Sequence, residues 1–357
     1  MNNSWKKNLF NFTLIIAFTV LVLYFTLKDQ FQAVSQLILN ISPLWLIIIL
    51  LWGIGYACIV GWILFVFGKK YRKDYSLLKG IGNAFVGIFF SGITPSATGG
   101  QFAQAYIFHK QGIKYSDGAS ILWADFIVYQ TTMMIYVTIL FFLRYAHFTK
   151  LLGAWIYVII AGYIINVCVI SVLWTMALFP KVYVRLSHLA LSLLHRLHLV
   201  KNKEETKQKW DEQLNSFTRE IKKLQKDKVL IIKTVSLNVL RMSVQFSLPF
   251  FISLALQSNI NASSFLDCLA LSSFVLMANS FIPIPGASGG TELVFVAVFQ
   301  TILASEAIAG SVMLLWRFST YHFVMVVGGI MFIILKRYYD TRRIEIEPKE
   351  EQLCELA

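Results

Sequence analysis

The chain alternates long apolar runs with short polar or basic segments. About 20 apolar residues are needed to cross the hydrocarbon core of a bilayer as a helix. Runs that meet this length, or nearly do, are residues 9–27, 44–67, 118–143, 153–179, 229–256 and 310–335. Two more apolar segments, residues 77–112 and 265–304, are interrupted by Pro and Gly. The pattern predicts an all-α polytopic membrane protein with spanning helices and two broken helices.

The two interrupted segments share a short phrase, which reads PSATGG at residues 95–100 and PGASGG at residues 285–290. Proline ends a helix, a hydroxyl residue can cap the next one, and glycine lets a ligand approach the backbone. We therefore expect residues 77–112 and 265–304 to form re-entrant helix hairpins, each broken at its phrase. The alternative is that both phrases are ordinary loops with a coincidental Gly and Pro content.

Basic residues fix the expected orientation, because cytoplasmic loops are enriched in Lys and Arg. Residues 69–73 hold four basic side chains, and residues 180–228 hold twelve Lys and Arg against six Asp and Glu. Both segments, and with them the N-terminus and the C-terminus, are predicted to be cytoplasmic. Two spans lie between residue 112 and the second basic segment, and two crossings return the chain to the side on which it started. Residues 77–112 must therefore begin and end on the cytoplasmic side.

The order of spans divides the chain into two halves, residues 1–150 and 151–337, followed by a cytoplasmic tail, residues 338–357. Each half has the order span, span, broken hairpin, span. Because each half has three spans, an odd number, the second half would start on the opposite side of the membrane and be inverted relative to the first. Inverted repeats with broken helices near the midplane are typical of transporters. Non-helical backbone at that depth is tolerated where it is buried in protein or lines a cavity. The order predicts a polar cavity between the two phrases.

Composition narrows the class of protein. Hydrophobic residues make up 57% of the chain and charged residues 14%, which no soluble globular domain shows. The net charge of +13 follows from the basic loops, so no nucleic-acid partner is expected. The four Cys form no CxxC pair, and His188, His195 and His198 have no acidic or Cys ligand at a fitting spacing. We expect no disulfide, metal or cofactor.

Charged residues inside spans are the first candidates for function, because burying a charge in a membrane is costly. Glu292 falls in the first turn after the second phrase, where a carboxylate favours the helix dipole. Arg317 lies within the last span and needs a partner, for which Glu292 or Asp125 is expected. Arg241 lies deep in its span and can bind a phosphate. Asp267, near a span end, is expected to form a structural ion pair.

The phrases themselves supply neutral candidates. Free N–H groups at the start of a half-helix bind anions, and two such ends facing a cavity would suit a phosphate-bearing substrate. Near the first phrase, Gln101 and Gln104 occupy the region that corresponds to Glu292. The candidate substrate-binding residues are Thr98, Gly99, Gly100, Gln101, Gln104, Asp125, Arg241, Ser288, Gly289, Gly290, Glu292 and Arg317.

These motifs carry a resemblance to a known family. Residues 95–106 are similar to the pattern Pro-x-x-x-Gly-Glu-x-x-Arg-Ala-Tyr, with one extra residue and Gln at both charged positions. Residues 283–292 are similar to Pro-x-Pro-Gly-Gly-x-Gly-x-x-Glu. Asp125 and Arg317 match an acidic and a basic position, whereas Phe126 stands where an Arg often follows. From residue 5 to residue 337 the chain resembles the membrane domain of lysylphosphatidylglycerol synthases, also called the flippase-like domain.

The resemblance implies a translocator that moves an anionic or aminoacylated phospholipid, such as lysylphosphatidylglycerol, across the bacterial cytoplasmic membrane. It also implies resistance to cationic peptides. Full-length members have a C-terminal cytoplasmic domain that transfers lysine from lysyl-tRNA to phosphatidylglycerol, whereas residues 338–357 are too few for a domain. We therefore expect contacts with a phospholipid headgroup and its acyl chains.

Other interpretations stay open from the sequence. The protein could be the phosphatidylglycerol lysyltransferase itself, or the membrane subunit of such an enzyme. It could also be a scaffold that docks a partner lipid-modifying enzyme through the apolar stripe of residues 210–224. A homo-oligomer is compatible with each of these functions.

Overall fold

The computed structural model of the protein describes residues 31–94, 97–179, 222, 226–278, 285–287, 289–303 and 305–341. The expected first span, residues 9–27, lies outside these residues, as does nearly all of the expected cytoplasmic loop. The helices are α2 (Phe31–Leu39), α3 (Pro43–Tyr71), α4 (Leu77–Ile93), α5 (Thr98–Lys110), α6 (Tyr115–Leu143), α7 (Tyr145–Leu151), α8 (Trp155–Leu178), α11 (Lys228–Ala255), α12 (Ser264–Ala278), η3 (Pro285–Ala287), α13 (Gly290–Leu303), α14 (Glu306–Arg317), η4 (Phe318–Phe323) and α15 (Val324–Thr341).

The described chain is an all-α polytopic membrane protein, as predicted. Five helices are long and apolar enough to cross a membrane: α3, α6, α8, α11 and the continuous run from α14 to α15. They coincide with the five expected spans that fall within the described residues. Basic side chains follow the apolar stretch of α3, whose last turn contains Lys69 and Lys70.

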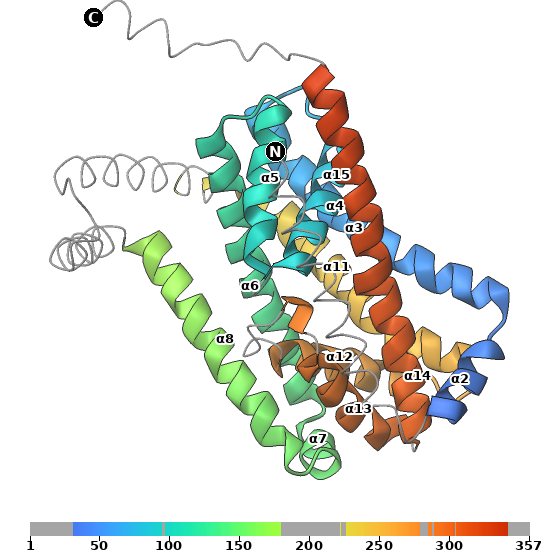
Figure 1. Cartoon of the computed structure of the whole chain (residues 1–357). Coiled ribbons are helices and arrows are strands. Elements are labelled where there is room, and N and C mark those ends of the chain that lie inside the picture. Colours follow the sequence, from blue (N-terminus) through green and yellow to red (C-terminus); the bar gives the residue numbers. More distant parts are fainter. Residues whose placement is uncertain are drawn as a thin grey trace, which may run out of the picture.

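The two interrupted segments are broken where the Pro and Gly phrases predict. Helices α4 and α5 flank the first break, and α12 and α13 flank the second, with the short turn η3 between them. The first pair lies toward one end of the bundle and the second pair toward the other (Figure 1). This placement is what opposed re-entrant hairpins require, and the equivalence of the two halves stays a prediction.

Glycine permits very close contact between α3 and α4. A Cβ atom added to Gly61 would collide with the backbone of Ile81, and one added to Gly80 would collide with the carbonyl oxygen of Gly61. Small residues let helix backbones approach in membranes, where van der Waals packing replaces the hydrophobic drive to associate. Helix α4 is thereby held between α3, α5 and α15.

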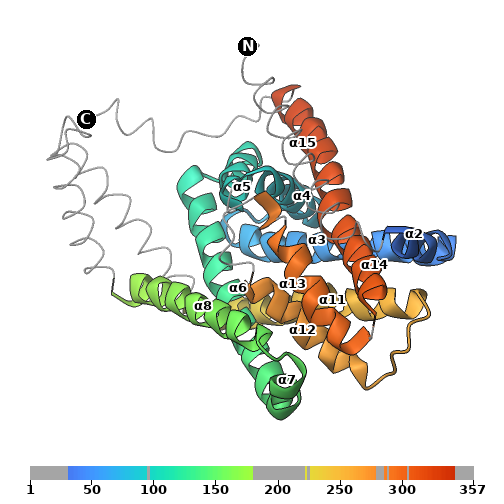
Figure 2. The same cartoon turned by 60° about the horizontal axis from the view of Figure 1, so that its bottom comes forward.

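Helices α14 and α15 run as one long helix in Figure 2, joined by the wide π-helical turn η4. This turn packs against α3: Ser319 is fully buried and its hydroxyl donates to the carbonyl of Ile49. Gly53 faces the same turn, since an added Cβ would touch the carbonyl oxygen of Ser319. The last span is therefore locked against α3 at its middle.

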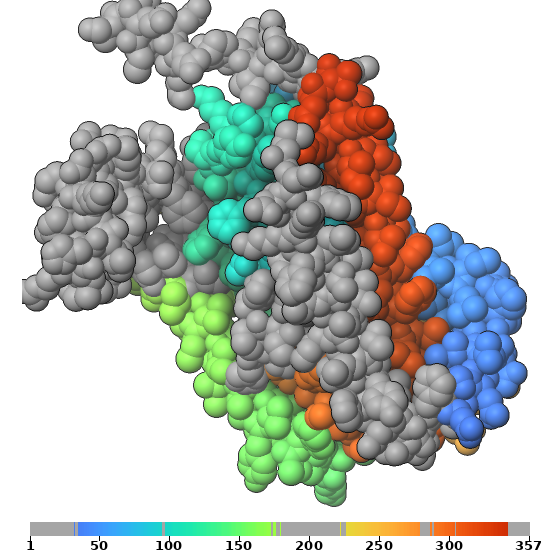
Figure 3. Space-filling view, viewed as in Figure 1, coloured from blue at the N-terminus to red at the C-terminus, as the bar shows by residue number. Residues whose placement is uncertain are grey.

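Two helices lie at the flanks of the molecule. In the space-filling view, α8 and α2 occupy opposite sides (Figure 3). The corner between α6 and α8 is tied to α12 by Asp267, whose carboxylate oxygens lie 3.7 Å from Arg144 and 3.7 Å from His147. Asp267 is thus in a structural ion pair, as expected.

Candidate functional site

The second break is closed by a buried ion pair. The Nε of Arg317, on α14, donates to Oε1 of Glu292, on α13, at 3.0 Å, and both side chains are buried. The other carboxylate oxygen, Oε2, accepts the amide of Gly289 at 2.6 Å. Arg317 also donates to the carbonyl of Gly286 at 2.9 Å. Of the two expected partners of Arg317, the structure selects Glu292.

The ion pair is linked to the first broken segment through Tyr321. The Arg317 guanidinium lies 4.4 Å from the centre of the Tyr321 ring, and the Tyr321 hydroxyl donates to the carbonyl of Gly92 at 2.9 Å. Gly286, with φ +62°, packs against the same ring so closely that a Cβ atom would collide with it. The end of α4 and the turn η3 are therefore in contact. The predicted polar cavity between the phrases involves residues outside the described ones and stays a prediction.

The first break differs from the expectation that Thr98 caps α5. The N-cap position is Ala97, in the left-handed region with φ 55°, and it makes no side-chain capping bond. Thr94 takes that role, because its hydroxyl oxygen accepts the Gly99 amide at 2.9 Å. Gly99 and Gly100 bring α5 close to the end of α4, where Cβ atoms would collide with Thr94 and Ser91. Here the glycines permit close helix packing, and the roles of Thr98, Gly99 and Gly100 in substrate binding stay predictions.

The two glutamines after the first phrase have different surroundings. Gln101 is exposed, whereas Gln104 is partly buried and its side chain packs against Gly87 of α4. The carbonyl of Gln104 accepts the side-chain amide of Asn83 at 3.3 Å. Ser288 lies outside the described residues. The roles of Gln101, Gln104 and Ser288 in substrate binding stay predictions.

A second polar centre lies at the middle of the bundle, around Arg241 of α11. The guanidinium donates to the hydroxyl of Tyr56, on α3, from Nε at 3.2 Å and from a terminal nitrogen at 2.9 Å. It also lies 4.2 Å from the centre of the Tyr129 ring, on α6. Asp125, one helical turn before Tyr129, is close enough to interact electrostatically with Arg241. We call Tyr56, Asp125, Tyr129 and Arg241 the central cluster.

The central cluster is incompletely satisfied by protein groups. Oδ1 of Asp125 is buried and has no hydrogen-bond partner among the residues that the structure describes. Gln245, one turn after Arg241, has a buried Oε1 that likewise has no hydrogen-bond partner among the described residues. Buried polar atoms are usually hydrogen-bonded, and an exception requires an explanation such as strain, a bound water or ion, or a functional role. The sequence had indicated Asp125 and Arg241, but not the two tyrosines, which resemble any other tyrosine of a membrane helix.

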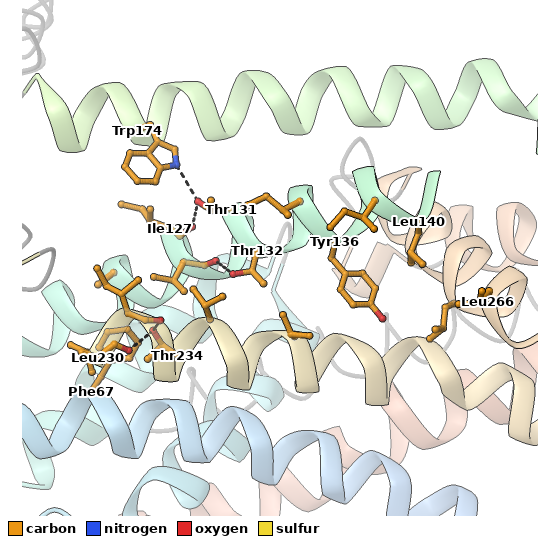
Figure 4. A pocket seen from close by; sticks show the side chains of 18 residues that line it. Phe67, Ile127, Thr131, Thr132, Tyr136, Leu140, Trp174, Leu230, Thr234 and Leu266 are labelled. Atoms are coloured by element: carbon orange, nitrogen blue, oxygen red, sulfur yellow. Dashed lines mark hydrogen bonds between the residues drawn. The ribbon is translucent and has the colours of Figure 1, made fainter. Parts of the chain in front are cut away.

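An apolar groove runs between α6, α8 and α11 (Figure 4). Its volume is about 520 Å³, and it extends from Phe67 and Leu230 at one end to Leu140 and Leu266 at the other. Helices α6 and α11, which form its walls, also carry Asp125, Tyr129 and Arg241 of the central cluster.

The few hydroxyl groups in the groove are already hydrogen-bonded. Thr131, Thr132 and Thr234 each donate to the carbonyl four residues earlier in their own helix. Thr131 also accepts the indole N–H of Trp174, and the Tyr136 hydroxyl pairs with Ser243. These groups need no water, so the groove is suited to hydrocarbon.

The helical bundle and its charged groups at membrane depth define a polytopic integral membrane protein with polar sites inside the bundle. Residues 12–328 match the model of the lysylphosphatidylglycerol synthase transmembrane region, and the chain belongs to this family. The chain is also similar to a UPF0104 membrane protein of Pyrococcus horikoshii. The two are 26% identical over 316 residues, which cover 86% of this chain and 89% of the relative.

Proposed function

We propose that this protein translocates a phospholipid with an anionic or aminoacylated headgroup across the membrane, and that Arg241 binds the headgroup phosphate. In this proposal Asp125 lies beside the phosphate site and receives a cationic group where the headgroup has one. The acyl chains stay in apolar surroundings, for which the groove between α6, α8 and α11 offers a path. Resistance to cationic peptides follows where the transported lipid alters the charge of the outer leaflet.

The observation that carries the proposal is that Arg241 has few acceptors for its N–H groups and no carboxylate partner among the described residues. Arginine has five N–H donors. Among the described residues, the guanidinium of Arg241 donates only to the Tyr56 hydroxyl, and no carboxylate lies within ion-pair distance of it. A guanidinium in the middle of a span is costly unless it serves a ligand or a partner. Its planar donors fit a phosphate in a bidentate manner.

The Glu292–Arg317 pair has a different role in this proposal. The carboxylate already accepts the Gly289 amide, so the chain itself fills the position that a substrate anion would take at the start of α13. We therefore assign the headgroup to the central cluster and assign the pair to holding the two breaks together.

The test is lipid translocation in vesicles that contain the purified protein. Fluorescently labelled phosphatidylglycerol, lysylphosphatidylglycerol and phosphatidylcholine are compared for wild type, Arg241→Met and Arg241→Lys. We expect Arg241→Met to lower the rate for the preferred lipid at least tenfold, since charge-assisted hydrogen bonds contribute about 1.5–3 kcal/mol. Arg241→Lys should recover part of the rate, because lysine keeps the charge and loses the bidentate geometry.

Arg337→Met is the matched control, because Arg337 is exposed near the end of α15. It should leave the rate unchanged, and the thermal midpoint of Arg241→Met should not fall below that of wild type. Translocation of every lipid by Arg241→Met at the wild-type rate would refute the assignment of the headgroup site.

The family also favours a second candidate function, the transfer of lysine to phosphatidylglycerol, because its name refers to lysylphosphatidylglycerol synthases. The experiment is direct: purified protein receives phosphatidylglycerol and lysyl-tRNA. Formation of lysylphosphatidylglycerol would replace a pure translocator with an enzyme. If the product forms only after a soluble partner is added, the protein is the membrane subunit of a lipid-modifying enzyme.

A further inference from the structure

A second cavity lies away from the central cluster, between the last turns of α3 and the first turns of α11. Its volume is about 840 Å³. It opens on a face of α11 different from the one that lines the apolar groove, and Leu230, which is buried, borders both. We call it the basic cleft, because three of the residues that line it are lysines: Lys69, Lys70 and Lys233.

The charges of the basic cleft leave two lysines for a ligand. Asp227 is the one acidic residue among the described residues that line the cleft, and its carboxylate is already paired within the protein. Its carboxylate pairs with Lys70 and accepts the Leu230 amide at 3.0 Å as the N-cap of α11. The bond to Lys70 lowers the pKa of Asp227. Lys69 and Lys233 make no ion pair with any residue that the structure describes.

The polarity of the basic cleft changes along the wall that α3 forms, whereas on the α11 wall the apolar residues Val229 and Ile232 precede Lys233. On α3, Trp62 lies seven residues before Lys69, about 10 Å deeper along the helix. Between them, Phe65 contributes a ring that lies 5.4 Å from the Lys69 ammonium. On α11, Leu237 lies one turn deeper than Lys233. The α3 wall is therefore cationic at one end and aromatic at the other, which matches the polarity of a phospholipid with a negative headgroup, and Lys233 adds a second cation from α11.

We propose that the basic cleft is a binding site for an anionic phospholipid of the leaflet that faces Lys69 and Lys233. The two lysines hold the phosphate, and Trp62, Phe65 and Leu237 contact the acyl chains. Basic pockets between membrane helices bind anionic headgroups in this manner. The ligand stays at one leaflet and is separate from the lipid that is proposed to cross at the central cluster.

The test is lipid binding to detergent-purified protein, measured by native mass spectrometry with phosphatidylglycerol and phosphatidylcholine as probes. We expect wild type to retain phosphatidylglycerol with a Kd at least tenfold lower than that for phosphatidylcholine. Lys69→Gln and Lys233→Gln should each weaken the binding of phosphatidylglycerol about fivefold, because each basic residue near the surface contributes about 1 kcal/mol. The affinity for phosphatidylcholine should stay unchanged. Lys233→Glu should weaken the binding of phosphatidylglycerol further, because it reverses the charge.

The matched control is the double variant Lys336→Gln with Arg337→Gln, which removes two exposed charges from the end of α15, outside the cleft. It should bind phosphatidylglycerol as wild type does. Equal binding of both lipids by wild type would overturn the proposal, because it would show that the cleft does not select a negative headgroup. Competition by glycerophosphoglycerol at the same concentration as the intact lipid would also overturn it, since the acyl chains would then contribute nothing.

Discussion

Neutralising one member of the Glu292–Arg317 pair should destabilise the protein more than neutralising both. In Glu292→Gln, Arg317 loses its 3.0 Å charge-assisted bond while its side chain remains only 8% exposed. Two of the contacts that Arg317 keeps, with the Gly286 carbonyl and the Tyr321 ring, involve groups without a formal charge. Breaking a buried ion pair in this way costs about 3–5 kcal/mol, because an uncompensated charge stays in a medium of low dielectric constant.

The double variant, Glu292→Gln with Arg317→Gln, should recover most of the loss. It leaves no lone charge, and a glutamine oxygen at position 292 can still accept the Gly289 amide. The expected coupling energy between the two sites is about 3 kcal/mol or more, well above the additivity error for distant sites. Translocation should be lost in the single and the double variants, because the pair ties together the two breaks.

The measurement is thermal unfolding of all variants in one detergent, followed by tryptophan fluorescence. Glu306→Gln is the matched control, since Glu306 is an exposed acid in the first turn of α14. It should shift the midpoint by less than a quarter of the shift of Glu292→Gln. A thermal midpoint of Glu292→Gln equal to that of wild type would refute this prediction. So would a decrease of the midpoint in the double variant that equals the sum of the two single losses.

Three further predictions concern packing, capping and orientation. Gly61→Ala should lower the thermal midpoint and the yield of folded protein, because its Cβ would collide with the backbone of Ile81; an unchanged midpoint would show that α3 and α4 are less tightly packed. Asp227→Ala should also lower the midpoint at pH 7. The lowered pKa of Asp227 means that its contribution is present above the unfolded value near 4, so the difference from wild type should shrink as the pH falls below about 4. A cysteine at Lys203 should be labelled from the cytoplasm only and one at Asn259 from outside only, and the reverse result would overturn the assigned orientation.

The helices could be predicted because their signals are local. Runs of apolar residues end at basic clusters, and proline with glycine interrupts them, so both kinds of element follow from short stretches of sequence. The contact between Glu292 and Arg317 could also be expected, because a charge inside a span requires a partner and few were available. Even so, Asp125 was an equal candidate until the structure placed it beside Arg241.

Other parts of the site could not be predicted, because they depend on distant contacts or on loop geometry. Tyr56 and Tyr129 are two of 15 tyrosines in an aromatic-rich chain, and only the crossing of α3, α6 and α11 brings them to Arg241. Thr94 caps α5 in place of Thr98 because Ala97 adopts a left-handed backbone that moves the first turn onto α4. Sequence spacing does not contain that information.

The wide turn η4 sets the helical phase of the last span. In an uninterrupted α-helix, residues eleven apart lie on nearly the same face, because they are separated by about three turns. Arg317 and Gly328 have this spacing, yet Arg317 faces Glu292 of α13 while Gly328 faces the Phe85 carbonyl of α4. The π turn accommodates one additional residue, which rotates the part of the helix after it by about 100° relative to an uninterrupted α-helix. Deletion of one residue between positions 318 and 323 would therefore rotate every later residue of the helix away from its present neighbour.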